Sequence, residues 1–280
     1  MSEFPIQFDE ENNLKLIDSG ADGPTVAVIA CVHGNERVGV DVLRHIVEEV
    51  RVIRGKVWLI GGNPRAYALN KRFVERDLNR CFGVDGIAYE NERAREIVEV
   101  LDQCDAVLDI HQSFEPQNFV VCESISVPLA CKFDVPYVIT SVNDLNVGST
   151  DAYMESKGKI GICLESGGMN DADQVENEEY AFGGVVRFLF TMGNIREVKP
   201  SESTELPRVL QAYSEYQTRA RFVPVEGLSM FDQLAVGQVI GTDGGERVLC
   251  PSEWEGHRIL FLHKEEAGKP AFGVARVVGD

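Results

Sequence analysis

The stretch VAVIACVHGNERVGV, residues 26–40, decides the fold prediction. Its first seven residues are apolar, rich in β-branched side chains and without polar alternation, as expected of a strand covered on both faces. From Val38 to Val50, apolar residues recur at three- and four-residue spacing with charged residues opposite them, which is typical of an amphipathic helix. The stretch therefore predicts a buried strand that leads through a Gly-Asn turn into a helix.

Further apolar runs of strand length follow along the chain: KVWLIGG (56–62), AVLDI (106–110), PYVIT (136–140) and GICLE (161–165). A second helical pattern occupies residues 91–101. Strands that alternate with helices indicate an α/β layer architecture. We therefore predict a mostly parallel or mixed sheet flanked by helices.

The pattern changes at residues 199–207, KPSESTELP, which contain almost no apolar side chains. Beyond them, short strand-like runs such as ARFVPV and RILFLH alternate with turn signals such as TDGGE and EAGKP. This spacing is typical of a small all-β module. We predict a larger domain over residues 1–198 and a small β-rich domain over residues 199–280, which could roof an active site in the first.

Composition argues against several classes of function. The 280 residues include 27 basic and 45 acidic side chains, a formal net charge of −18, which repels nucleic-acid phosphates and acidic membrane surfaces. The first twenty residues lack a basic, apolar leader, and the longest apolar run is far shorter than a membrane span. Seven cysteines without a CxxC pair indicate reduced thiols and a cytoplasmic protein, and argue against a cysteine-bound zinc. A homo-oligomer remains open.

Histidine and glutamate side chains follow two of the predicted strands. His33 and Glu36 stand three residues apart after the first run, and His111 closes the run at 106–110. Ligands bind at the carboxyl ends of strands in open α/β sheets, and two histidines with one glutamate are a ligand set of catalytic zinc. Taken singly, each also fits a structural role, as a helix cap or a hydrogen-bonded histidine. Their conjunction predicts a catalytic metal site.

Two further features carry possible chemistry. Glu165 ends the run GICLE, and an acid at the end of a buried strand is costly unless it is paired or functional. Residues 63–83 gather five basic side chains: Arg65, Lys71, Arg72, Arg76 and Arg80. Guanidinium groups bind carboxylates through paired hydrogen bonds, so this segment predicts an anion-binding site. A solvated basic face that pairs with Glu75 and Asp77 is the alternative.

The motifs HGNE, NPRA, RFVERDLNR, DIH and LESG occur in this order between roughly residues 24 and 170. Together they resemble the succinylglutamate desuccinylase/aspartoacylase family of the zinc carboxypeptidase-like superfamily, and the β-rich tail resembles that family's second domain. The resemblance implies a zinc-carboxypeptidase-like fold. It also implies a zinc-dependent amidohydrolase that cleaves the linear amide bond of a small N-acyl amino acid.

The resemblance implies roles for the residues at the predicted metal site. His33, Glu36 and His111 would hold one zinc ion per chain. Asp77 would accept a hydrogen bond from His33 and so fix the tautomer that binds the metal.

The resemblance implies further roles on the substrate side. Asn79 and Arg80 would bind the carboxylate of the amino-acid part of the substrate. Arg72 would polarise the scissile carbonyl, and Glu165 would be the general base.

Family members specific for acidic acyl groups or aspartate carry arginine and tyrosine contacts upstream of the base. Here that stretch reads STDAYMESKGKIG, with Tyr153 but no arginine, so the resemblance does not fix the acyl group. Two other functions stay open: a metallocarboxypeptidase that removes C-terminal residues from peptides, and a binding protein that keeps the fold and metal without hydrolysis. The remaining histidines, His45, His257 and His263, are predicted to be non-ligands.

Overall fold

The computed structural model describes residues 13–142, 147–169, 174–196 and 205–278. The chain divides into two compact units, one over residues 1–138 and 146–207 and the other over residues 139–145 and 208–280. The predicted domain boundary after residue 198 falls outside the described residues. So do the first twelve residues of the amino-terminal stretch in which no leader is expected.

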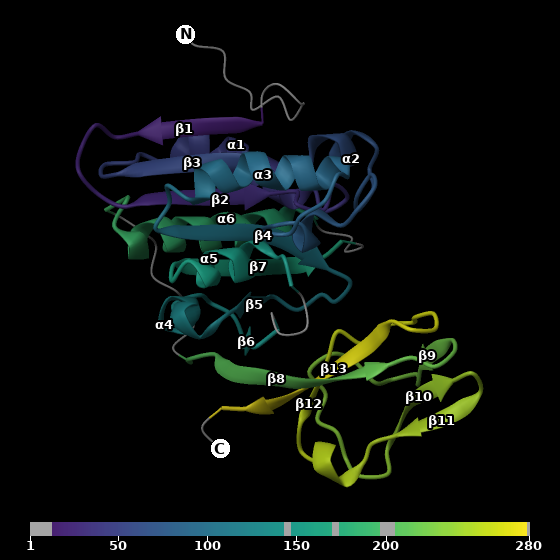
Figure 1. The fold of residues 1–280 in the computed structure, drawn as a ribbon. Coiled ribbons are helices and arrows are strands. Elements are labelled where there is room, and N and C mark those ends of the chain that lie inside the picture. The colour runs from purple at the N-terminus through teal and green to yellow at the C-terminus, as the bar shows by residue number, and fades with distance from the viewer. Residues whose placement is uncertain (1–12, 143–146, 170–173, 197–204, 279–280) are drawn as a thin grey trace. The chain divides into compact units, whose positions relative to one another are not determined.

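The first unit is built on a mixed sheet (Figure 1). Its strand order is β1 (Leu14–Asp18), β3 (Lys56–Gly61), β2 (Thr25–Ala30), β4 (Ala106–Ser113), β7 (Ile160–Gly168), β5 (Phe119–Cys122) and β6 (Tyr137–Thr140), whose last two residues belong to the second unit. Strands β3, β2, β4 and β7 are parallel to one another, whereas β1 pairs antiparallel with β3 and β5 antiparallel with β7. The predicted fold class is confirmed.

Strands β1 and β5 are not predicted from the apolar runs of the sequence. The residues of β1 alternate between exposed and half-buried positions, so neither face of the strand is marked by fully buried apolar side chains. Strand β5 has only four residues, all of them buried, and an apolar run of that length does not distinguish a strand from a buried helical turn.

Helices cover both faces of this sheet (Figure 1). The bounds are α1 (Val38–Glu49) and α6 (Gln174–Met192) on one face, and α3 (Tyr89–Leu101) and α5 (Thr150–Ser156) on the other. Ala27 and Ile29 of β2 pack in one core with Leu101 of α3. On the opposite face α1 lies unusually close to the sheet, because a Cβ added at Gly39 would lie 2.6 Å from the Cβ of Ala30.

Short helices connect these elements: α2 (Pro64–Ala68), η1 (Leu78–Arg80), η2 (Ser124–Ser126), α4 (Val127–Ala130) and, in the second unit, η3 (Ser252–Trp254). Between α2 and η1 the chain forms no helix or strand. This segment, residues 69–77, is called the arginine loop below. It is largely exposed, with Asp77 the exception.

The second unit contains two antiparallel groups of strands: β8 (Arg208–Gln217), β13 (Pro270–Val277) and β12 (Arg258–Leu260) in one, and β9 (Phe222–Pro224), β10 (Val239–Asp243) and β11 (Glu246–Leu249) in the other. Tyr216 stacks on Phe272 at 5.1 Å between ring centroids, and Trp254 meets the same ring edge-on at 5.8 Å. Trp58 of β3 packs against the core of the first unit. Each unit thus has a core of its own.

Two predictions from composition can be compared with the structure. Within the described ranges, none of the helices combines the length and the apolarity that a membrane span needs. All seven cysteines have free thiols, and six of them are buried. The thiols therefore pack as small apolar side chains.

Candidate metal centre

His33 and Glu36 lie in a loop of seven residues between β2, which ends at Ala30, and α1, which begins at Val38. The Gly-Asn turn expected from the sequence is thus part of a longer loop. The loop opens with Cys31 in the left-handed region, at φ 54°, an uncommon conformation for a residue with a Cβ. The Glu36 N–H then donates to the His33 carbonyl at 3.0 Å, which closes a turn and brings both side chains to one side.

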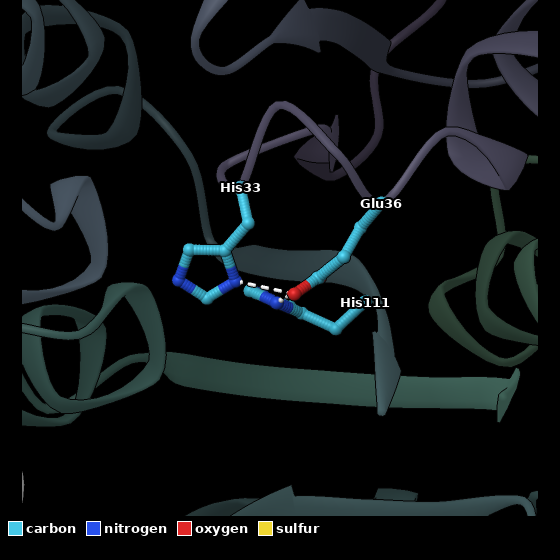
Figure 2. A group of neighbouring side chains, drawn as sticks. All are labelled: His33, Glu36 and His111. Atoms are coloured by element: carbon cyan, nitrogen blue, oxygen red, sulfur yellow. Dashed lines mark hydrogen bonds and ion pairs between the residues drawn. The ribbon is translucent and has the colours of Figure 1, made fainter. Parts of the chain in front are cut away.

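The three predicted metal ligands meet at one point (Figure 2). His33 Nδ1 lies 2.7 Å from Glu36 Oε1, and His111 Nδ1 lies 2.9 Å from Glu36 Oε2. The two imidazole rings stand 4.9 Å apart, and all three residues are almost fully buried. Strands β2 and β4 are parallel neighbours, so the adjacent strand ends bring together residues that are 75 or more positions apart.

The outward ring nitrogens face two further carboxylates. His33 Nε2 lies 3.0 Å from Asp77 Oδ1, and His111 Nε2 lies 3.0 Å from Asp109 Oδ2. Asp109 in turn accepts a hydrogen bond from Thr150 Oγ1 at 2.7 Å. Asp109 was not among the predicted site residues. Its signal is the D-I-H pattern, because residues two apart on a strand share a face.

Charges reinforce this arrangement. Burial alone raises the pKa of Glu36, but the two imidazoles beside it hold that pKa well below its ordinary value. Burial alone lowers the pKa of His111, yet Asp109, Cys163 and Glu36 raise it well above its ordinary value. The site therefore stabilises positive charge. Two imidazole nitrogens around a carboxylate, backed by two more carboxylates, fit a divalent cation such as zinc.

Arg72 of the arginine loop lies against this cluster. Its Nε and Nη2 donate to Asp77 Oδ2 at 3.2 and 3.0 Å, and its Nη1 donates to Glu36 Oε1 at 3.4 Å. The side chain is 41% exposed, so the guanidinium is held on one side while the other remains accessible. The Asp77 pKa lies far below its ordinary value because the bonds to His33 and Arg72 outweigh the effect of burial.

Glu165 lies on β7, directly opposite His111 of β4 in the parallel register. Its Oε2 is buried and has no hydrogen-bond partner among the described residues. Burial, assisted by Glu36, raises the pKa of Glu165 to about 7, although His111, His33 and Arg72 act in the opposite direction. A buried carboxyl with a free oxygen and such a pKa is equipped to exchange a proton near neutral pH.

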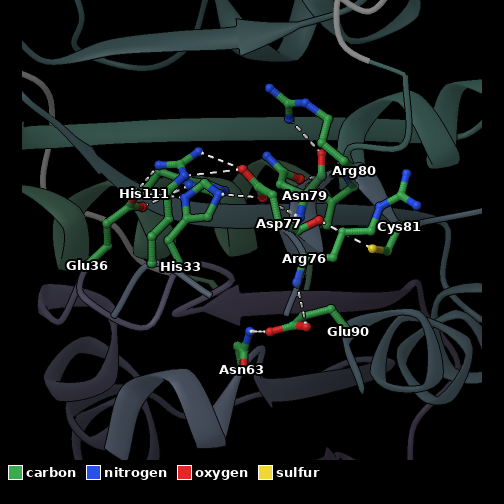
Figure 3. A network of polar contacts seen from close by, with 12 residues as sticks. His33, Glu36, Asn63, Arg76, Asp77, Asn79, Arg80, Cys81, Glu90 and His111 are labelled. Atoms are coloured by element: carbon green, nitrogen blue, oxygen red, sulfur yellow. Dashed lines mark hydrogen bonds and ion pairs between the residues drawn. The ribbon is translucent and has the colours of Figure 1, made fainter. Parts of the chain in front are cut away.

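Asn79 and Arg80 lie in η1, immediately after Asp77 (Figure 3). The side-chain oxygen of Asn79 accepts the Thr150 N–H at 3.2 Å, and Arg80 Nη1 donates to the Asn79 carbonyl at 2.7 Å. The Asp77 carboxylate also caps η1 by accepting the Asn79 N–H at 2.9 Å. One aspartate therefore joins the His33 imidazole to the segment that carries Asn79 and Arg80.

Other residues noted in the sequence lie elsewhere. His45 pairs with Glu49 of its own helix, and His257 with Tyr213. Among the described residues, the groups able to hold a metal ion include none of His45, His257 and His263. Tyr153 is packed in the core on the α3 face, where its hydroxyl donates to Asp102 at 2.6 Å.

The chain is similar to known proteins over most of its length. Residues 22–181 match the family model described as the succinylglutamate desuccinylase/aspartoacylase catalytic domain. A probable aspartoacylase from Nostoc sp. is 27% identical over 199 residues, 62% of this chain and 67% of that protein. An N-acyl-aromatic-L-amino acid amidohydrolase (carboxylate-forming) A from Danio rerio is 32% identical over 187 residues, 57% of this chain and 56% of that protein. The chain thus spans about two thirds of the first relative and just over half of the second.

Solved structures share the fold. A succinylglutamate desuccinylase/aspartoacylase from Rhodobacter sphaeroides superposes with a TM-score of 0.77 at 18% identity, over 95% of this chain and 89% of that chain. The product-bound ectoine utilization protein EutE (DoeB) from Ruegeria pomeroyi superposes with a TM-score of 0.72 at 18% identity, over 94% and 88%. Both alignments extend through the β-rich second unit as well as the first.

Proposed function

Because the chain belongs to the succinylglutamate desuccinylase/aspartoacylase family, we propose that it is a zinc-dependent hydrolase that cleaves the amide bond of a small N-acyl amino acid. The observation that carries this proposal is the placement of Glu36, whose two oxygens each face a histidine Nδ1. Glu165, whose Oε2 has no hydrogen-bond partner among the described residues, lies on β7, next to the strand β4 that carries His111. The relatives named above include an amidohydrolase of N-acyl aromatic amino acids.

One zinc ion would be held by His33, Glu36 and His111, a ligand set of catalytic zinc sites. Bound there, zinc would supply Lewis acidity, which acidifies water and polarises a carbonyl group. Asp77 Oδ1 would accept the hydrogen bond of His33 Nε2, and Asp109 Oδ2 lies 3.0 Å from His111 Nε2. A negative partner beside each outward nitrogen favours the tautomer whose inward Nδ1 is free to bind metal.

Glu165 would act as the general base. It takes a proton from the attacking water, whose oxygen bonds to the amide carbon. It then returns that proton to the amine nitrogen as the carbon–nitrogen bond breaks, giving a carboxylic acid and a free amino acid. The pKa of about 7 suits a group that must both accept and donate a proton near neutral pH.

Three residues would bind the substrate and its charge. Arg72 would donate hydrogen bonds to the oxygen that becomes negative in the transition state, a contribution of a few kcal/mol per preorganised donor. Asn79 and Arg80 would bind the carboxylate of the amino-acid part. Asp77 accepts hydrogen bonds from the Arg72 side chain and from the Asn79 N–H. These contacts hold Arg72 close to the segment that carries Asn79 and Arg80, which supports the assignment of all three residues to one substrate site.

The predicted organisation is compatible with this function. All of these residues precede residue 170, so we assign catalysis to the domain over residues 1–198 and treat residues 199–280 as a separate β-rich domain. A small molecule is the partner, since a net charge of −18 disfavours nucleic acid and acidic membranes. The free thiols favour a cytoplasmic location.

The deciding experiment is a hydrolysis screen of the zinc-loaded protein with N-acetyl, N-succinyl and N-acyl aromatic amino acids and with C-terminally free dipeptides. Glu165→Gln is the test variant, and Glu99→Gln on the exposed side of α3 is the matched control. We expect amino-acid release from acylated substrates by wild type and control, and loss of nearly all turnover with retained zinc in Glu165→Gln.

Other outcomes have definite meanings. Cleavage of the dipeptides alone would replace the proposal with a metallocarboxypeptidase. Inactivity towards both substrate classes would leave a metal-binding protein without hydrolysis. Full activity in Glu165→Gln would remove Glu165 from the role of base.

A further inference from the structure

Glu90, in the first turn of α3, is a buried carboxylate to which the proposed reaction assigns no role. It is fully buried, and its oxygens face the arginine loop rather than the metal centre. Oε1 accepts the Val74 N–H at 2.6 Å, and Oε2 accepts the Arg76 N–H at 3.0 Å. The Glu75 N–H lies between them and donates to Oε2 at 3.2 Å. Three successive backbone N–H groups therefore converge on one carboxylate.

Two side chains complete this anchor. Asn63 Nδ2 donates to Glu90 Oε1 at 3.2 Å, while Asn63 Oδ1 caps α2 by accepting the Ala66 N–H at 3.1 Å. In the reverse direction, the Glu75 carboxylate accepts the Tyr89 N–H at 2.8 Å. Figure 3 shows Asn63, Glu90 and Arg76 in this network beneath Asp77. The end of β3, the start of α2 and the start of α3 are thereby joined through one carboxylate.

The surroundings explain why the loop needs such an anchor. Residues 74–76 are exposed and belong to no helix or strand, so neither burial nor a regular hydrogen-bond ladder fixes their backbone. A charged acceptor makes the strongest hydrogen bonds available to backbone N–H groups. Removing this carboxylate leaves the three backbone N–H groups and the Asn63 amide without their common acceptor.

The anchored amides of residues 74–76 lie between two residues that contact the metal ligands. Arg72 lies two residues before the anchored segment, and Asp77 one residue after it. Arg72 binds Asp77 and Glu36, and Asp77 binds His33. Both side chains that contact the metal ligands from this loop therefore flank the backbone segment that Glu90 holds.

We propose that Glu90 is a positioning residue of the reaction: by binding the N–H groups of residues 74–76 it holds Asp77 behind His33 and Arg72 beside Glu36. This inference rests on the proposed function for its effect on turnover. Its effect on metal affinity depends only on the His33–Asp77 contact. Glu90 itself contacts neither metal ligands nor substrate.

The test is a double-mutant cycle on zinc affinity, measured by chelator competition. Removing a carboxylate that orients a metal-bound histidine lowers affinity about 10- to 100-fold, and we expect this of Asp77→Asn. Glu90→Gln places an NH2 group against N–H donors, and we expect it to lower affinity by a similar factor. In the Asp77→Asn background, Glu90→Gln should have little further effect, because it acts through Asp77. Additive losses would show that Glu90 does not act through Asp77 and would overturn the proposal.

Two further measurements address the loop and the turnover. Hydrogen exchange of the amides at 74–76 should become about tenfold faster or more in Glu90→Gln, as expected when hydrogen bonds to a charged acceptor are lost. Unchanged exchange would overturn the proposal. With acylated substrates, Glu90→Gln should lower kcat in the wild-type background and much less in an Arg72→Ala background.

Controls separate a failure of this proposal from a failure of the proposed function. Glu92→Gln, on the exposed side of the same helical turn, should leave exchange, affinity and turnover unchanged. Glu90→Asp, which keeps the charge on a shorter side chain, replaces Glu90→Gln if the latter does not fold, and should show the same effects at smaller size. If wild type hydrolyses none of the substrates, the proposed function fails, whereas zinc affinity and exchange still decide the role of Glu90.

Discussion

Each imidazole of the candidate metal centre is held between two carboxylates. Both inward nitrogens face Glu36, and the outward ones face Asp77 and Asp109. A ring held in this way cannot rotate without losing a charged partner on each side, so its orientation is fixed before any metal arrives. Partners of this kind orient the histidine ligands of metal sites.

Asp109→Asn tests this arrangement at the residue that the sequence analysis missed. An amide can present an N–H to His111 Nε2 and favour the tautomer that protonates the inward nitrogen, so we expect zinc affinity to fall about 10- to 100-fold. Asp85→Asn at an exposed position is the control. Equal affinities of the two variants, measured by chelator competition, would mean that Asp109 does not orient His111.

Glu165 should reduce the stability of the metal-free protein. Its pKa is about 7 in the folded chain against an ordinary 4.5, so the folded state holds the proton more tightly than the unfolded state. Stability conferred by that proton is present below pH 4.5 and is lost as the pH rises towards 7. At pH 8, without metal, Glu165→Gln should therefore be more stable than wild type by roughly 1–3 kcal/mol.

Urea unfolding of chelator-treated protein at pH 5 and pH 8 measures this difference. The advantage of Glu165→Gln should be larger at pH 8 than at pH 5, and Glu99→Gln should show no such trend. A variant that is less stable than wild type at pH 8 would show that the charged carboxylate is well accommodated and would remove the basis for its raised pKa.

At the scale of elements, the sequence predicted what hydrophobic periodicity encodes. Strands β2, β4 and β7 each contain an apolar run, broken in β4 by Asp109, and His111 and Glu165 lie where the runs of β4 and β7 end. The arginine loop could not be predicted in the same way, because its backbone is fixed by Glu90, fourteen or more residues further along the chain. Likewise, nothing in the local sequence marks Cys31 as left-handed.

Two glycines in helices should respond to alanine in opposite ways. Gly39 of α1 lies against Ala30, and an added Cβ would lie 2.6 Å from the Ala30 Cβ, so Gly39→Ala should cost about 1–3 kcal/mol by overpacking. Gly183 of α6 has no atom within 4 Å of the added Cβ, so Gly183→Ala should add roughly 0.5–1 kcal/mol through helix propensity. Urea unfolding of both variants checks the pair. Stabilisation by Gly39→Ala would show that α1 can move away from the sheet.

At the scale of the whole molecule, the candidate metal centre ties together distant parts of the first unit. His33 and Glu36 come from the loop after β2, His111 comes from β4, and Arg72 lies in the arginine loop. A metal that binds only when these segments are assembled stabilises the folded state by mass action.

Zinc should therefore raise the melting temperature of chelator-treated protein. At a free concentration of about 100 times the dissociation constant, the added stability is about 2.7 kcal/mol. His111→Ala should abolish the zinc-dependent shift, while His45→Ala, which alters a histidine paired with Glu49, should retain it. A shift of wild-type size in His111→Ala would place the bound zinc elsewhere.

The chain contains two tryptophans, and they fall one to each unit. Trp58 packs against the core beside α3, and Trp254 lies edge-on to Phe272 in the β-rich unit. Intrinsic tryptophan fluorescence therefore reports on both units, and the emission of each tryptophan can be isolated by replacing the other. In Trp254→Phe the emission follows only the first unit, and in Trp58→Phe only the second. Unfolding of the two units can thus be followed spectroscopically in the intact chain, without attached dyes.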